Sequence, residues 1–180
     1  MIQVNLAFGL YAGDNTEYYP PYRDDGGVYN AATSHFWFQN LLPPYINDMQ
    51  VGRKNEYIPK SISCPSATVD LNYGYSSGVY KPGTNLPGQT VPLKMGAAKS
   101  PSKTALMIDS VYSNVSYTSA SSGLLSARHL ERMNVLFLDG HIETKRLADI
   151  PDNNVKAGVC LGRFWDADNP SYLPSYDVWP

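Results

Sequence analysis

Residues 128–143 decide the fold, and they read RHLERMNVLFLDGHIE. Asn134 to Leu138 form a short apolar run, and residues 141–146 alternate apolar with polar side chains. Between them, Asp139-Gly140 is a preferred two-residue turn with positive φ at both positions. The sequence therefore predicts a β-hairpin.

The pairing of this hairpin follows from the length of its turn. In a two-residue hairpin the residues that flank the turn pair directly, so Leu138 would face His141 and Phe137 would face Ile142. Directly opposed side chains share a face, which predicts one core face and one mixed, partly covered face. The predicted core face is Val135, Phe137, Ile142 and Thr144, and the mixed face is Leu136, Leu138, His141 and Glu143.

The same segment has a second pattern, because His129 is followed by nine residues and then by Asp139-Gly140. Other blocks precede it in a fixed order: LAFGLYAGDN (6–15), YYPP (18–21), SCPS (63–66), YGY (73–75) and SPSKTALMIDS (100–110). Together the blocks span residues 1 to about 146. This arrangement resembles the prepilin-type processing-associated H-x9-DG domain family, which comprises bacterial proteins similar to type II secretion pseudopilins and type IV pilins.

The resemblance implies an α+β, pilin-like fold, in which an N-terminal spine helix packs on an antiparallel β-sheet with irregular loop insertions. Ile2, Leu6 and Leu10, with Val4 and Tyr11 as further members, recur at helical spacing, so we interpret residues 1–13 as the last turns of that helix, lying on the sheet. Residues 13–15 would end it. Family members begin with a basic leader and an apolar membrane-spanning helix, and neither pattern occurs in this sequence.

From this comparison with the family we expect a truncated, soluble piece of a longer protein. By resemblance, the missing helix would anchor the protein in the inner membrane, with the head in the periplasm or cell envelope. Residues 1–180 are expected to form a single head domain, in which residues 147–180 are an irregular C-terminal tail.

Length and composition fit a loop-rich domain, since the chain has 14 Gly, 14 Pro and only 17% charged residues. Periodicity predicts a second helix over residues 31–42 and strands over 72–76 and 104–109. Residues 111–123 are expected to be an exposed excursion, and residues 81–103 mostly connection.

The expected function is structural. By resemblance, the protein is a pseudopilin or minor pilin of a type II secretion or type IV pilus-like filament, with other pilin subunits, the secretion machinery and the inner membrane as partners. The formal net charge is −2 and basic residues do not cluster, so no nucleic-acid partner is expected. The 14 tyrosines leave an alternative open, an envelope-anchored module that binds a glycan or another surface polymer through exposed aromatics.

One set of ionisable side chains suits a zinc site, or a base with its orienting partner: His129, Asp109, Asp139, His141 and Glu143. Asp139 and Gly140 are expected to shape the turn in the first place. A ring nitrogen of His129 is expected to bind the loop that enters the hairpin to the turn or to a strand backbone. A hydrolytic role would require one of the histidines to lie in a cleft beside a carboxylate. No nucleophile-elbow, metalloprotease or phosphate-loop pattern occurs, so no enzyme is expected.

Two further sites remain open from the sequence. Cys64 and Cys160 could form one disulfide that closes a long loop, or Cys64 could pair with a spine-helix cysteine that relatives often carry upstream. The resemblance to major pseudopilins, which can hold calcium in a C-terminal loop, makes Asp166 and Asp168 calcium candidates, although acidic residues in such a tail are more often only solvated. No other cofactor is expected.

Overall fold

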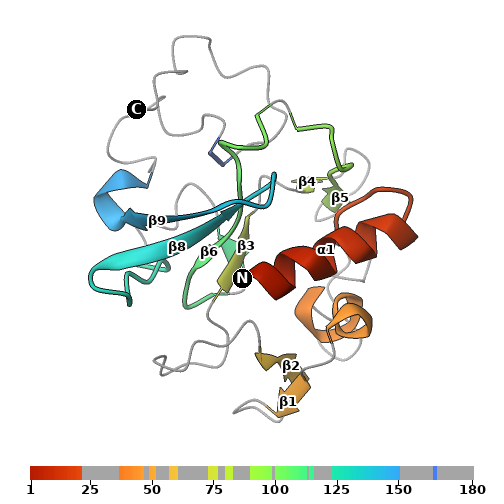
Figure 1. Ribbon diagram of the computed structural model, residues 1–180, viewed down its shortest axis with the longest axis horizontal. Helices are drawn as coiled ribbons and strands as arrows, with labels where there is room; N and C mark the ends of the chain where they lie inside the picture. Colours follow the sequence, from red (N-terminus) through yellow and green to blue (C-terminus); the bar gives the residue numbers. More distant parts are fainter. Residues whose placement is uncertain are drawn as a thin grey trace. The chain divides into compact units, whose positions relative to one another are not determined.

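The structure is a computed structural model with an N-terminal α-helix and an antiparallel β-sheet, so the fold class is α+β (Figure 1). It describes residues 1–21, 37–46, 49–51, 57–60, 73–76, 80–82, 90–98, 100–112, 114–115, 123–150 and 164–165. The chain divides into two compact units, Met1–Asp70 with Tyr80–Met95, and Leu71–Val79 with Gly96–Pro180.

The first unit contains α1 (Ile2–Asp14), a π-helical turn η1 (Trp37–Leu41) and a 3-10 turn η2 (Pro43–Tyr45). It also contains two antiparallel strand pairs, β1 (Met49–Val51) with β2 (Tyr57–Pro59), and β4 (Tyr80–Pro82) with β5 (Thr90–Pro92).

Two predictions for this unit need correction. The helix predicted over residues 31–42 is a single π-helical turn in its described part, where the Leu42 N–H donates to the Trp37 carbonyl oxygen (3.0 Å). Residues 31–36 lie outside the described residues. The interpretation of residues 81–103 as mostly connection missed β4 and β5, because strands of three residues are too short to show a period of two.

The N-terminal helix is confirmed, since α1 covers residues 2–14 where residues 1–13 were predicted. It ends at Asn15, whose N–H donates to the carbonyl oxygens of Tyr11 (3.0 Å) and Ala12 (3.2 Å). Thr16 and Glu17 then adopt positive φ angles of 53° and 67°, which turn the chain away from the helix axis.

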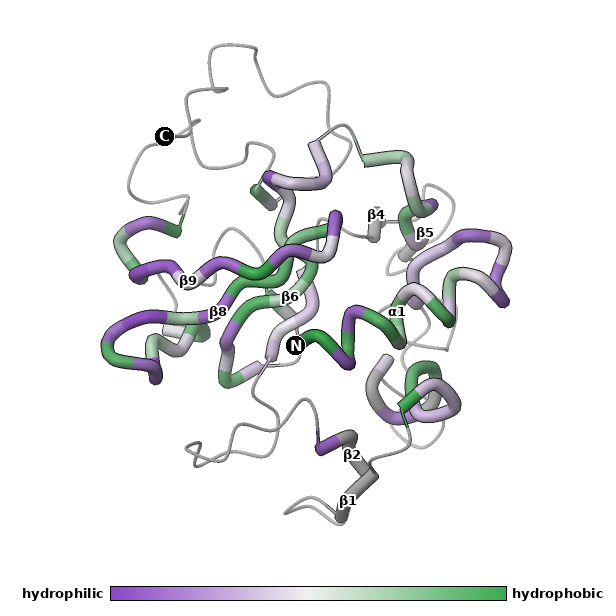
Figure 2. The backbone as a smooth tube through the Cα atoms, in the orientation of Figure 1, coloured by the Kyte–Doolittle hydropathy of each residue, from purple (hydrophilic) through white to green (hydrophobic). Residues whose placement is uncertain are grey.

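One side of α1 is buried within its own unit and another side is exposed. The buried side chains are Val4, Ala7, Phe8 and Ala12, and the Phe8 ring lies 5.6 Å from the Trp37 ring and 6.2 Å from the Tyr19 ring. Three side chains that we expected to lie on the sheet are exposed, Ile2 by 77%, Leu6 by 63% and Leu10 by 49%. Figure 2 shows hydrophobic residues along most of the helix. The packing of the helix on the sheet stays a prediction, because helix and sheet belong to different units.

The second unit is built on a five-stranded sheet in the order β7-β3-β6-β8-β9. Its strands are β3 (Tyr73–Ser76), β6 (Ala105–Asp109), β7 (Asn114–Val115), β8 (Arg132–Phe137) and β9 (Ile142–Arg146). The strands predicted over 72–76 and 104–109 are therefore confirmed. Neighbouring strands are antiparallel except β3 and β7, which are parallel. The predicted excursion over 111–123 thus contains a sheet strand, and its Val115 is buried.

Apolar side chains from the sheet and from the later part of the chain form one core in this unit. Figure 2 shows that β6 and β8 are mainly hydrophobic and β9 mainly hydrophilic. The core cluster is Ala105, Ile108, Val115, Leu125, Met133, Val135, Phe137, Ile150, Phe164 and Trp165. The last three belong to residues 147–180, the segment expected to be an irregular tail, so part of that tail completes the core.

The turn between β8 and β9 differs from the predicted two-residue turn. The Gly140 N–H donates to the Phe137 carbonyl oxygen, and the Phe137 N–H donates to the His141 carbonyl oxygen, both at 3.0 Å. Gly140 has a φ of 91°, whereas Asp139 has a negative φ. The loop is therefore the three-residue type that places glycine in the left-handed region, and positive φ at both positions was wrong.

This turn shifts the register by one residue and moves every β9 side chain to the other face. Val135 lies opposite Glu143, and Leu136 lies opposite Ile142. The predicted core face is therefore wrong for β9, where Ile142 is 38% exposed and Thr144 is exposed. Since β8 is buried on both faces after residue 134, its own pattern could not reveal the error.

Candidate functional site

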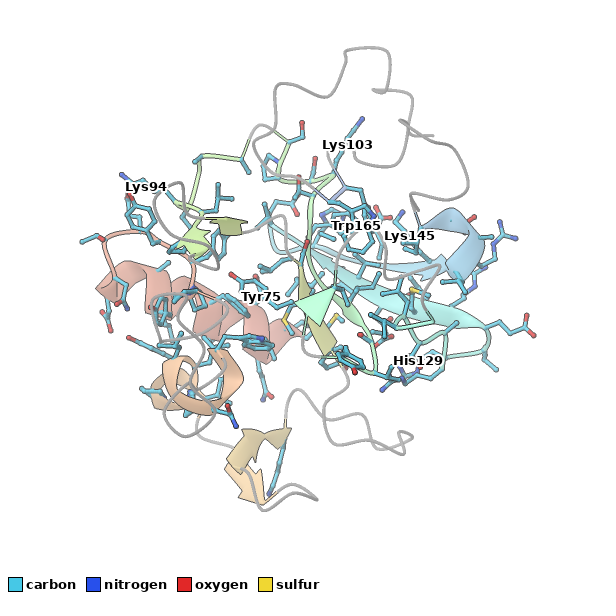
Figure 3. All side chains as sticks on the ribbon, turned by 180° about the vertical axis from the view of Figure 1, so that it is seen from behind. Tyr75, Lys94, Lys103, His129, Lys145 and Trp165 are labelled. Carbon is cyan, nitrogen blue, oxygen red and sulfur yellow. The ribbon has the colours of Figure 1, made fainter. Side chains whose placement is uncertain are left out.

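His129, the histidine of the H-x9-DG pattern, lies at the start of the hairpin (Figure 3). It is beside a buried carboxylate. His129 Nε2 is 3.5 Å from Asp109 Oδ2, and the side chain of His129 is 36% exposed while that of Asp109 is fully buried. Asp109 is the last residue of β6, and His129 comes three residues before β8. Two of the sequence blocks therefore meet here through their ionisable side chains.

Asn134 of β8 holds the same carboxylate oxygen. Its backbone N–H donates to Asp109 Oδ2 at 2.6 Å, and its side-chain Nδ2 donates to the same atom at 3.3 Å. The other oxygen, Asp109 Oδ1, is buried without a hydrogen-bond partner in the described part of the chain. Burial raises the pKa of Asp109, and the Asn134 backbone hydrogen bond, then the nearby His129 and Arg128, act against that rise.

Arg128 fixes the loop that leads to the histidine. Its NH2 group donates to the Ser110 carbonyl oxygen (2.8 Å), and its Nε donates to Ser126 Oγ (3.1 Å). The Ser110 hydroxyl donates to the Leu124 carbonyl oxygen at 2.8 Å. The site therefore joins the end of β6, the loop before the hairpin and the start of β8. We call Asp109, Arg128, His129 and Asn134 the carboxylate cluster.

The buried carboxylate makes stability depend on pH. Because the folded pKa of Asp109 is raised, its contribution to stability is fully present below the unfolded pKa and is lost as the pH rises through the folded pKa. We expect the free energy of unfolding of the protein, relative to Asp109→Asn, to fall as the pH rises above the ordinary aspartate pKa of about 3.9. Urea unfolding at several pH values measures this, and carbon NMR of the carboxyl group gives its titration directly.

The variant Asp149→Asn is the matched control with the opposite sign. The hydrogen bond from Arg146 lowers the pKa of Asp149, so its contribution should be lost as the pH falls. The difference in the free energy of unfolding between the protein and Asp109→Asn should therefore change with pH. A difference that is the same at every pH would mean that burial does not raise the pKa of Asp109.

A strained turn separates the histidine from β8. His129 and Arg132 exchange both backbone hydrogen bonds (3.0 and 3.1 Å), so Leu130 and Glu131 form a two-residue turn. Both have positive φ, 53° and 62°, which L-residues with a Cβ adopt at a cost. Leu130 is also 95% exposed, so this turn presents an apolar side chain to solvent.

Replacing Leu130-Glu131 by Asn-Gly should raise the free energy of unfolding by about 1–2 kcal/mol, because that pair suits positive φ at both positions. Urea unfolding is the measurement. Leu130→Ala removes the exposed side chain but keeps the strain, and should change stability by less than about 0.5 kcal/mol. A less stable Asn-Gly variant would mean that Leu130 or Glu131 makes a favourable contact worth more than the strain.

The Asp139-Gly140 turn carries a separate surface network. Asp139 Oδ1 accepts a hydrogen bond from the His141 backbone N–H (3.2 Å), which agrees with a geometric role for the aspartate. The same oxygen lies 2.5 Å from His141 Nδ1, and Glu143 Oε1 lies 3.3 Å from Nε2. The His141 ring is stacked on Phe137, with centroids 4.3 Å apart.

This geometry does not suit a metal site built from His141 and Glu143. The two carboxylates flank opposite ring nitrogens, so they cannot share a single ion with the imidazole. Lys145 Nζ already binds Glu143 Oε2 (2.5 Å), and this hydrogen bond lowers the pKa of Glu143. Among the described residues, no group of three or more His, Cys, Asp or Glu side chains could hold a metal ion.

Comparisons with known proteins identify no family for this chain. No protein-family model, curated protein or solved structure matches this chain. Within the described ranges, every helix is too short or too polar to cross a bilayer. The resemblance to the H-x9-DG family therefore enters below as a proposal.

The remaining predicted sites fall outside the described residues. These are the cysteines Cys64 and Cys160 and the calcium candidates Asp166 and Asp168. Asp149, from the same tail, is described and is bound by Arg146 through Nε (3.0 Å) and NH2 (3.3 Å).

Sequence reasoning missed Asn134 and Arg128, although it included Asp109 and His129 among the candidates. The signal for Asn134 was present, because an amide in the apolar run Met133-Asn134-Val135 requires a hydrogen-bonding partner once the strand is buried. Nothing local identified that partner, which lies 25 residues earlier in the chain.

Proposed function

We propose that this chain is the head of a pseudopilin or minor pilin, a structural subunit of a type II secretion or type IV pilus-like filament. The supporting observation is the exposed stripe of α1, formed by Ile2, Leu6 and Leu10. A helix that is apolar on nearly all sides normally lies in a packed interior. Covering each of these side chains would contribute up to about 1.5–3 kcal/mol, and we propose that a neighbouring subunit covers them in the filament.

The two ends of the motif support the same proposal. His129 is in the carboxylate cluster that holds β6 and β8 together, and Asp139 and Gly140 shape the hairpin turn. All three residues serve the framework of the head. By this account the motif positions a scaffold and carries no catalysis, and the protein is not an enzyme.

The proposed surroundings follow from the family. The protein would be anchored in the inner membrane by an N-terminal helix, with its head in the periplasm or cell envelope, and would contact other pilin subunits and the secretion machinery. The glycan-binding alternative requires exposed aromatics. Most of the described aromatic side chains are buried, including Trp37, Tyr75 and Trp165, and this favours the filament.

The test changes the stripe in the natural protein within its own cells. Chemical cross-linking of the natural protein should give ladders of linked subunits. Leu6→Asp and Leu10→Asp should each abolish these ladders, because a charge on this face cannot be buried between subunits. Leu130→Asp is the matched control, since Leu130 is exposed and lies outside the helix. If the ladders persist in both helix variants at normal protein levels, the stripe is not part of the contact between subunits.

A further inference from the structure

Strand β9 forms one edge of the sheet (Figure 1). Within the described ranges it pairs with β8 and with no other strand. The backbone N–H and C=O groups of successive residues point alternately toward β8 and away from it, as in any antiparallel pair. The Phe137 N–H donates to the His141 carbonyl oxygen, so the groups of residues 141, 143 and 145 point toward β8. Those of Ile142, Thr144 and Arg146 therefore point outward.

The side chains along this edge carry both signs of charge. The strand reads Ile142-Glu143-Thr144-Lys145-Arg146. Natural edge strands often carry charged side chains, especially lysine, that prevent pairing with another chain. Here Glu143 and Lys145 flank Thr144 symmetrically and lie on the same face, where Lys145 Nζ forms an ion pair with Glu143 Oε2 at 2.5 Å. An antiparallel second copy of β9 would therefore place its Lys145 opposite Glu143 and its Glu143 opposite Lys145.

We propose that β9 pairs with β9 of a second copy of this chain, antiparallel and centred on Thr144. Glu143 then lies opposite the partner's Lys145 at both ends of the pair, and Ile142 lies beside the aliphatic stem of the partner's Arg146. Centring on Glu143 would place two glutamates opposite each other, and centring on Lys145 would place two lysines there. The charges therefore select one register.

The backbone fits the same register. Thr144 and its copy would exchange both N–H to carbonyl hydrogen bonds, and the Ile142 N–H would donate to the partner's Arg146 carbonyl oxygen. The Arg146 N–H already donates to Asp149 Oδ2 (3.3 Å), so that one outward donor is used within the chain. Glu143 and Lys145 would form the closer, non-hydrogen-bonded pairs, where side chains interact most directly.

This contact closes after two copies, because the same surface is used on both sides. A filament grows through contacts between different surfaces, so the proposed pairing is separate from the filament contact and does not depend on it. The exposed stripe of α1 takes no part in it.

Charge reversal tests the pairing by analytical ultracentrifugation of the head. The protein should form a dimer that weakens with added salt, and Glu143→Lys should weaken it at least tenfold. Lys145→Glu should do the same. Mixing the two single variants should give a heterodimer, and the double variant Glu143→Lys with Lys145→Glu should restore the homodimer. A protein that stays monomeric up to about 1 mM overturns the proposal.

A backbone pair of variants covers the case in which charge reversal impairs folding. Thr144→Pro removes an outward N–H without removing a β8 hydrogen bond, and should abolish the dimer. Thr144→Val keeps that N–H and loses the same side-chain hydrogen bond to Asn134, so it should dimerise normally. A dimer unaffected by Thr144→Pro would use another surface. Amide exchange of Ile142 and Thr144 that is slow at every concentration would mean that the edge is covered within the monomer, and either result overturns the proposal.

Discussion

Trp165→Ala is expected to lower the free energy of unfolding by about 3–5 kcal/mol, the range for removing a buried aromatic side chain. Trp165 is 3% exposed, and its ring lies edge-on to Phe164 with centroids 4.8 Å apart. Phe164 in turn lies edge-on to Phe137 of β8, and its carbonyl oxygen accepts a hydrogen bond from the Ala105 N–H (2.9 Å). The segment is therefore fixed to the sheet by backbone and side chains together.

Urea unfolding followed by circular dichroism measures this loss. Leu130→Ala is the control, because the same kind of truncation at a 95% exposed position should cost less than about 0.5 kcal/mol. A loss below about 1 kcal/mol for Trp165→Ala would mean that the tryptophan does not complete the core of this unit.

Gly74→Ala should destabilise the protein by about 1–3 kcal/mol, through overpacking between β3 and β7. A Cβ at Gly74 would lie 2.2 Å from Val115 Cγ1, 3.0 Å from the Tyr112 carbonyl oxygen and 3.1 Å from Ser110 Cβ. The first neighbour is a branched side chain and the second is backbone, so neither can move away freely. Thermal unfolding should show a lower Tm.

Two further variants separate overpacking from the other effects of alanine. Adding Val115→Ala should recover part of the loss in a double-mutant cycle, because it removes the closest clashing atom. Gly9→Ala in α1 has nothing within 4 Å and should instead stabilise the helix by about 0.5–1 kcal/mol. Additive effects of Gly74→Ala and Val115→Ala would contradict the close approach of these two residues.

The sequence predicted the hairpin but not its register. Asp-Gly suits a two-residue turn with positive φ at both positions, and it equally suits a three-residue turn with only the glycine in that region. The two turns differ by one residue, which decides the face of every β9 side chain. Burial of both faces of β8 left no pattern that could have decided between them.

The helix shows a similar limit. Its existence followed from local composition, but apolar residues lie on nearly all sides of it, so the sequence did not show which side packs within its own unit. Strand β7 depends on a partner distant in the sequence, and β4 and β5 are too short to show a period of two.

The sequence predicted some residues of the candidate site but not how they are arranged. Asp109 and His129 were both named from the sequence, yet their contact depends on the pairing of β6 with β8. Asn134, which donates two hydrogen bonds to the carboxylate, becomes meaningful only once that pairing is known. The sequence thus named two of the four residues of the carboxylate cluster, and the sheet topology supplied their geometry.

The filament assignment is tested most directly by cross-linking the natural protein in its own cells, with and without the prepilin peptidase. The account predicts a processed protein that forms cross-linked ladders, and it predicts that both processing and ladders vanish without the peptidase. A protein that stays unprocessed and monomeric at the envelope in both strains would contradict it.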